Sequence, residues 1–114
     1  MAFGIADLQP EKEPFELEDG EIIYFVSLAE FDARQKAEFK RAKNELEMAE
    51  KRFERARDDA GREEAVMLQK EISQKLVRVI LPDLPKADLD GLTMGQMDMV
   101  LNHWTKLNEG QQGN

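Results

Sequence analysis

The sequence contains no cysteine and only one histidine and one tryptophan. Without thiols, disulfide bonds, thiolate metal sites and cysteine nucleophiles are excluded, and the cytoplasm is the default location. The hydroxyl side chains of serine and threonine are few: Ser27, Ser73, Thr93 and Thr105. A catalytic triad needs a base that is oriented by an acid and aimed at a nucleophile, and the residues around His103 show no such signature. We therefore expect a structural role for His103, no catalytic residues and no enzyme activity.

Long apolar runs are absent as well. The longest, Ile22 to Val26, is far shorter than the roughly 20 residues of a membrane-spanning helix. Residues 1–7 lack the basic start and apolar stretch of a secretory signal. The sequence thus predicts a protein with no membrane partner that stays where it is made.

Signatures of metal and cofactor binding are weak. Asp88-x-Asp90-Gly91 is similar to the start of a calcium loop, but Met99 stands at the twelfth position, where a bidentate glutamate is required. No glycine-rich phosphate loop of either common type is present. The sequence therefore predicts no metal site and no cofactor.

Negative charge is concentrated in the first third of the chain. Residues 1–33 hold nine acids and one base, whereas residues 34–114 hold fifteen of each, so the net charge of −8 arises from the first segment. Nucleic-acid binding depends largely on Lys and Arg displacing counterions, and the basic residues between 34 and 78 alternate with acids as on a solvated helix face. We expect no nucleic-acid partner.

The first third also indicates a flexible arm followed by a β-hairpin. Residues 1–14 carry two prolines in an acidic context and are expected to form a flexible arm. Residues 15–26 alternate in polarity around Asp19-Gly20, a pair that suits a type I′ turn. Because an isolated two-stranded hairpin is marginally stable, its apolar face must pack on another element.

A long helix is expected next. Ser27 and Glu30 match a capping box, and an apolar seam follows at spacings of 3 and 4. Its members are Phe39, Ala42, Leu46, Ala49, Phe53, Ala56 and Ala60. A helix from Leu28 to Ala60 would be about 50 Å long. Gly61 is expected to adopt the left-handed conformation just past its end.

The remainder predicts two further helices. Apolar residues from Ala65 to Val79 recur at helical spacing, and that helix must end before Pro82. A capping box at Thr93 and Gln96 opens a helix that places Met97, Val100, Leu101 and Trp104 on one face. We expect this helix to fold back onto Phe31 and Phe39, which the second helix is too short to cover, and residues 109–114 to form a flexible tail.

The expected fold is therefore mainly α, with an N-terminal β-hairpin, a long antiparallel helical hairpin and a C-terminal helix in one domain of residues 15–108. The sequence leaves open whether the heptad-like seam is internal core or also supports homo-oligomers. Candidate partner-binding residues are apolar side chains left without a partner, or methionines that suit adaptable surfaces. They are Phe31, Phe39, Met94, Met97, Met99 and Trp104.

The C-terminal third resembles a known family. The run Leu76-Val77-Arg78-Val79-Ile80-Leu81-Pro82-Asp83-Leu84-Pro85, followed by Leu89, Leu92-Thr93, Gln96 and Leu101 to Trp104, is similar to tail assembly chaperones of long-tailed bacteriophages. The resemblance implies binding to the helical tape measure protein, help in recruiting tail tube subunits, action in the host cytoplasm and absence from the mature virion. It also implies the short form of a pair made by ribosomal frameshifting, and it supplies no catalytic residues.

A second interpretation is an acidic helical regulator or inhibitor that acts by protein–protein binding and could mimic a nucleic acid. It requires the acids to line one continuous face. The concentration of acids in residues 1–33 favours it, and the neutral remainder of the chain counts against it.

Overall fold

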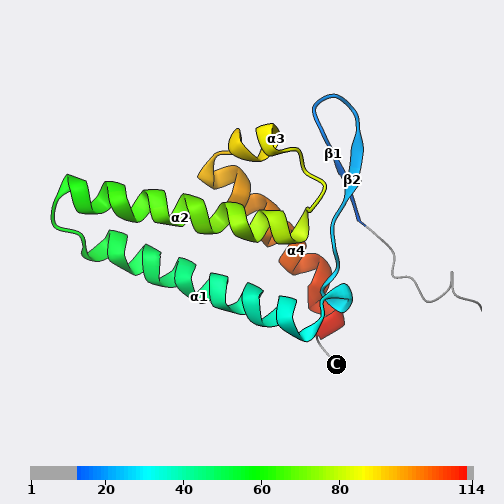
Figure 1. The fold of residues 1–114 in the computed structure, drawn as a ribbon, viewed down its shortest axis with the longest axis horizontal. Helices are drawn as coiled ribbons and strands as arrows, with labels where there is room; N and C mark the ends of the chain where they lie inside the picture. The colour runs from blue at the N-terminus through cyan, green and yellow to red at the C-terminus, as the bar shows by residue number, and fades with distance from the viewer. Residues whose placement is uncertain (1–12, 113–114) are drawn as a thin grey trace, which may run out of the picture.

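Two short strands, one turn of 3₁₀ helix and four α-helices follow one another along residues 13–112, the part of the chain that the computed structural model describes (Figure 1). The elements are β1 (Pro14–Glu16), β2 (Ile22–Tyr24), η2 (Leu28–Glu30), α1 (Ala33–Arg55), α2 (Asp59–Ile80), α3 (Lys86–Asp90) and α4 (Met94–Gln112). This confirms the predicted fold class. The predicted flexible arm falls outside the described residues, except for Glu13 and Pro14.

The β-hairpin pairs Pro14 with Tyr24 and Phe15 with Ile23 in an antiparallel register. Its turn is not type I′, because that turn requires positive φ at both central residues and only Gly20 has one, at 88°. The N–H of Gly20 donates to the carbonyl of Leu17 at 2.9 Å, and the N–H of Leu17 donates to the carbonyl of Glu21 at 2.8 Å. A three-residue loop that ends in a left-handed glycine therefore replaces the predicted turn.

The predicted long helix is interrupted near its start. The carboxylate of Glu30 accepts from the N–H of Ser27 at 3.1 Å, as expected of a capping box, but the helix that follows is the single turn η2. Phe31 is extended, with ψ of 133°, and Asp32 then caps α1 by accepting from the N–H of Gln35 at 2.8 Å. The 23 residues of α1 span about 35 Å, so the expected rod of about 50 Å was wrong.

The turn between α1 and α2 also differs from the prediction. Ala56 is extended, and Asp58 caps α2 by accepting from the N–H of Gly61 at 2.7 Å. Gly61 is therefore inside the first turn of α2 and is not a left-handed residue beyond α1. An added Cβ at Gly61 would lie 2.8 Å from Oδ1 of Asp58, so the missing side chain leaves room for the capping carboxylate.

The last helix begins as predicted and ends later. Thr93 and Gln96 form a reciprocal capping box, with N–H to side-chain oxygen distances of 2.8 and 3.1 Å. α4 then continues to Gln112, so residues 109–112 are helical where a flexible tail was expected. The short helix α3 precedes it and packs on α2.

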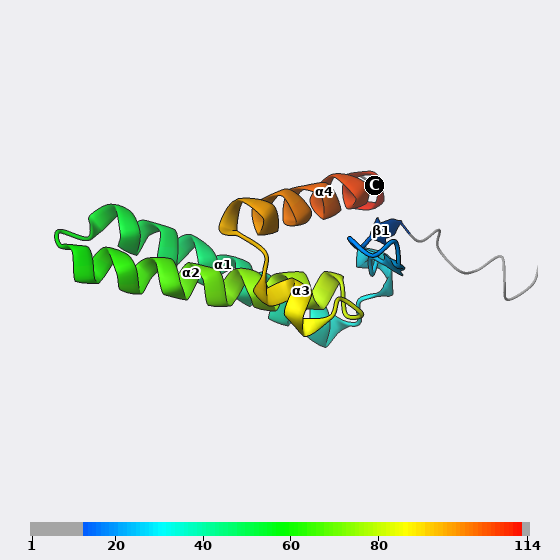
Figure 2. The same ribbon diagram turned by 90° about the horizontal axis from the view of Figure 1, so that it is seen from above.

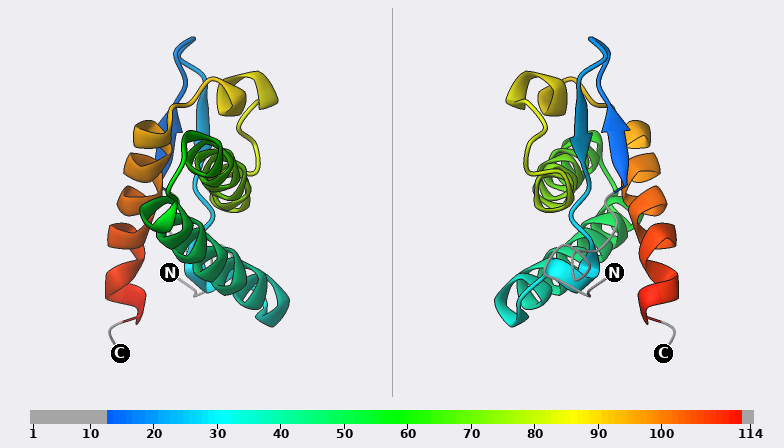
Figure 3. Two further views of the ribbon diagram at one scale, coloured as in Figure 1. Left: turned by 90° about the vertical axis from the view of Figure 1, so that its left-hand side faces the viewer. Right: turned by 90° about the vertical axis from the view of Figure 1, so that its right-hand side faces the viewer.

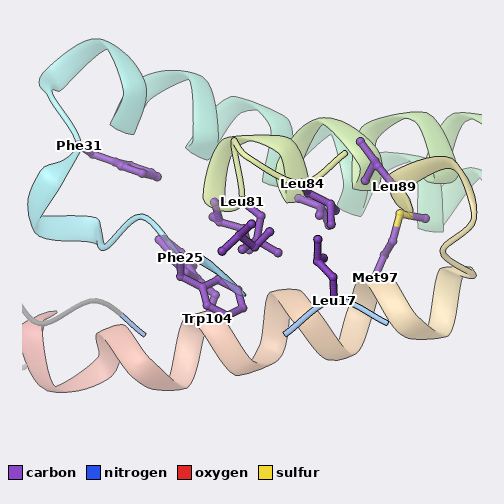
Figure 4. Close-up of a cluster of buried hydrophobic side chains, with 11 residues drawn as sticks. Leu17, Phe25, Phe31, Leu81, Leu84, Leu89, Met97 and Trp104 are labelled. Carbon is purple, nitrogen blue, oxygen red and sulfur yellow. The ribbon is translucent and has the colours of Figure 1, made fainter. Parts of the chain in front are cut away.

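The principal core lies where the β-hairpin, α2, α3 and α4 meet (Figure 4). Val77, Ile80 and Leu81 are fully buried at the end of α2, and Leu17, Phe25 and Met97 cover them from the hairpin and α4. The N–H of Val26 donates to the carbonyl of Ile80 at 2.9 Å and attaches the hairpin to α2. A second, smaller cluster of Ala49, Ile72 and Leu76 holds α1 against α2.

Candidate functional site

An aromatic cluster joins the start of α1 to the end of α4. The ring of Trp104 stacks on Phe31, with centroids 5.7 Å apart, and lies 5.0 Å from the ring of Phe39. Phe31 and Phe39 meet edge to face at 5.9 Å. Such ring pairs add about 0.5–1.5 kcal/mol each to the free energy gained by burial. The prediction that the C-terminal helix folds back on Phe31 and Phe39 is confirmed.

Asn108 supports this cluster from the next turn of α4. Its side chain is buried, its Oδ1 accepts from the N–H of Leu28 at 2.8 Å, and its Nδ2 donates to the carbonyl of Trp104 at 2.7 Å. The amide thus satisfies a backbone donor of η2 and ties η2 to α4. Asn108 was not among the residues that the sequence singled out, although it lies four residues after Trp104 and so on the same helix face.

A groove runs beside the aromatic cluster, between α1 and α4. Two adjoining cavities form it, of about 510 and 460 Å³, and both are lined by Phe39, Lys43, Glu47 and Thr105. Phe31 and Trp104 lie at one end of this α1–α4 groove, and Leu46, Leu76 and Leu101 lie at the other. Figure 3 shows α1 and α4 diverging toward the C-terminal end of α4. An apolar base between two helices is the form of a site that receives a third helix.

Charges along the α1–α4 groove change sign from end to end. Lys36, Lys40 and Lys43 follow one another at spacings of 4 and 3 on α1, beside the aromatic end. Glu47, Glu50 and Asp98 line the aliphatic end. Within the described residues none of the three lysines has an ion-pair partner, and Nζ of Lys43 lies 5.9 Å from the ring centroid of Phe39. The alternating charges of the sequence predict a solvated face for these lysines, and all three are exposed.

The three candidate methionines are distributed differently. Met97 is fully buried in the principal core and Met94 packs against that core from its partly exposed position. Met99 is 72% exposed. None of the three lines either cavity of the α1–α4 groove. Of the six candidate residues, the structure therefore brings together Phe31, Phe39 and Trp104 at the groove and leaves the methionines apart from it.

His103 is half exposed on α4. Its Nε2 lies 3.6 Å from Oε1 of Glu13, and its ring centroid lies 5.7 Å from that of Phe25. No group of three or more histidines or acids that could hold a metal ion is found in residues 13–112. In the same part of the chain, no helix is both long and apolar enough to cross a membrane.

Comparisons with known proteins return no relatives. No protein-family model matches the chain, and neither the search of curated proteins nor the search of solved structures finds a match.

Proposed function

We propose that the protein is a tail assembly chaperone that holds an apolar stripe of the helical tape measure protein in the α1–α4 groove. The observation that carries this proposal is an exposed groove with aromatic and aliphatic residues at its base, formed between two helices whose outer surfaces are charged. A protein that keeps an aggregation-prone helix in solution needs both an apolar surface for capture and a charged exterior.

The dimensions of the groove set the size of the bound segment. From Lys36 to Glu50, the residues of α1 that line it cover about 21 Å, which equals about four turns of a partner helix. Such a helix would present apolar residues at i, i+3, i+4 and i+7. Its acids would lie beside the lysine end and its bases beside Glu47 and Glu50, because opposite charges favour this one direction of binding.

Co-expression tests the proposal with the full chain. The tape measure protein that the proposal places in the neighbourhood of this gene is produced with the wild-type chain or with Thr105→Tyr, which fills the groove from an exposed position shared by both cavities. Lys106→Tyr is the matched control, because Lys106 is exposed on α4 and lines neither cavity.

We expect wild type and Lys106→Tyr to keep the tape measure protein soluble and to co-purify with it. Thr105→Tyr should reduce the recovered complex at least about tenfold, which corresponds to 1.4 kcal/mol of binding free energy. Equal recovery with both variants would refute the groove as the binding site. The chaperone role itself fails if the wild-type chain recovers no tape measure protein.

A co-purification test of the same kind distinguishes the chaperone proposal from the second interpretation, an acidic regulator. An acidic regulator would instead bind a DNA-binding protein, and neutralising the acids of residues 1–33 would abolish that binding.

In the chaperone proposal the protein acts in the host cytoplasm, helps to recruit tail tube subunits and leaves before the virion is complete. Mass spectrometry of purified virions should then detect no peptides of this chain.

A further inference from the structure

The turn end of the α1–α2 hairpin extends beyond α4 (Figure 2), so α4 does not cover this part of the hairpin. Arg52 of α1 and Glu64, Met67 and Glu71 of α2 line a shallow depression of about 820 Å³ on this part. An adjoining depression of about 370 Å³ shares Arg52 and Glu64 and adds Arg55. Arg52 lies about 120° around α1 from Leu46, which lines the α1–α4 groove, so this is a different surface of the hairpin.

Exposed methionines accompany these charges. Met67 is 66% exposed on α2, and Met48 is 65% exposed on α1. Met48 lies one turn before Arg52 and hence on the same side of α1. We name this surface the tip face and define it by six residues: Met48, Arg52, Arg55, Glu64, Met67 and Glu71. It combines flexible apolar side chains with charges of both signs.

The two helices of the tip face carry opposite charge. Residues 51–57 hold four bases and one acid, a balance of +3, and residues 59–71 hold two bases and four acids, a balance of −2. In the described part of the chain, Arg52, Arg55, Glu64 and Glu71 have no ion-pair partner within 4 Å. Their charges are therefore available to an external partner.

A basic helix beside an acidic helix is complementary to a second copy of itself. A two-fold axis parallel to the hairpin places α1 of one copy against α2 of the other, so every contact between bases and acids occurs twice. We propose that the tip face is a homodimer interface in which two hairpins form a four-helix bundle, with both turns at the same end and the methionines at the centre. Arg52 and Arg55 of each copy then face Glu64 and Glu71 of the other.

Sedimentation velocity of the full chain alone tests this proposal, and it does so independently of any tape measure protein. The sedimentation coefficient of wild type should rise with concentration from the monomer to the dimer value. Met67→Glu should raise the dimer dissociation constant at least about tenfold, because it adds an unpaired charge at the centre of the interface. Met99→Glu is the matched control, since Met99 is similarly exposed but lies on α4, and it should leave the dimer unchanged.

A charge exchange distinguishes this arrangement from any other dimer. Arg52→Glu/Arg55→Glu makes both helices of the tip face acidic, and Glu64→Arg/Glu71→Arg makes both basic, so each variant alone should be monomeric. Mixing them should restore a dimer, because both pairs of facing helices then carry opposite charge. Circular dichroism confirms that each variant is folded. A wild-type chain that stays monomeric, or variants that dimerise as well alone as when mixed, would overturn the proposal.

Discussion

The indole Nε1 of Trp104 donates a hydrogen bond to the carbonyl oxygen of Val26 across 78 positions of sequence, at 2.6 Å. Val26 directly follows the β-hairpin, and its N–H is bonded to the carbonyl of Ile80. One residue therefore connects the hairpin to both α2 and α4. Because Trp104 also stacks on Phe31, a single side chain positions one end of the α1–α4 groove.

Replacing Trp104 with alanine should lower the free energy of unfolding by about 3–5 kcal/mol, because it leaves a cavity beside Phe31 and Phe39 and removes both ring contacts of Trp104. Trp104→Phe retains a ring and should lose less, mainly the hydrogen bond to Val26, which is worth about 1 kcal/mol. Urea denaturation followed by circular dichroism measures both changes. If the free energy of unfolding of Trp104→Ala equals that of the wild type, the packing of α4 on Phe31 and Phe39 does not stabilise the fold.

Asn108→Ala should destabilise the protein by about 1–3 kcal/mol, because the N–H of Leu28 loses its acceptor in a partly buried position. Asn102→Ala is a suitable control: Asn102 is exposed on the same helix, and its replacement should change the free energy of unfolding by less than about 0.5 kcal/mol. Equal effects of the two substitutions would contradict a structural role for the Asn108 amide.

Ser73→Ala should stabilise the fold. The hydroxyl of Ser73 is fully buried in α2 and finds no hydrogen-bond partner among the described residues. Removing it eliminates the cost of a buried polar group that has no partner, and alanine is the better helix former. We expect a gain of about 1 kcal/mol, seen in calorimetry as a rise of about 4 °C in the melting temperature. A lower melting temperature would indicate that the hydroxyl has a partner after all.

Gly20→Ala should destabilise the hairpin by about 1–2 kcal/mol. The φ of Gly20 is 88°, and the left-handed region is unfavourable for residues with a Cβ atom. Open space surrounds the position, since an added Cβ would have no neighbour within 4 Å, so the cost would come from the backbone alone. Thermal denaturation of the Gly20→Ala and Gly20→Asn variants tests whether the backbone is the cause. Asparagine tolerates a positive φ better than alanine, so Gly20→Asn should lower the stability less.

Part of the groove could be predicted from the sequence because apolar area must be covered. Phe31 and Phe39 were left without a partner by the length of the second helix, and Trp104 was on the only face that could cover them. Hydrogen-bond partners do not follow from such reasoning: the acceptor for the Leu28 N–H is 80 positions away, on Asn108. The lysine row was predicted to be solvated, and Lys36, Lys40 and Lys43 are exposed, but alternating charges on a helix do not reveal that a groove lies beside them.

By itself, the sequence determined the order of the β-hairpin and the three long helices, since periodicity, capping residues and proline act over a few neighbouring positions. The sequence also contains a second capping box, Asp32-x-x-Gln35, which marks the true start of α1. Local sequence alone does not distinguish it from the capping box at Ser27 and Glu30. Only the tertiary structure decided that Phe31 leaves the helical path to stack on Trp104. It also decided where α1 and α4 diverge to form a groove, because the angle between helices depends on packing among residues distant in sequence.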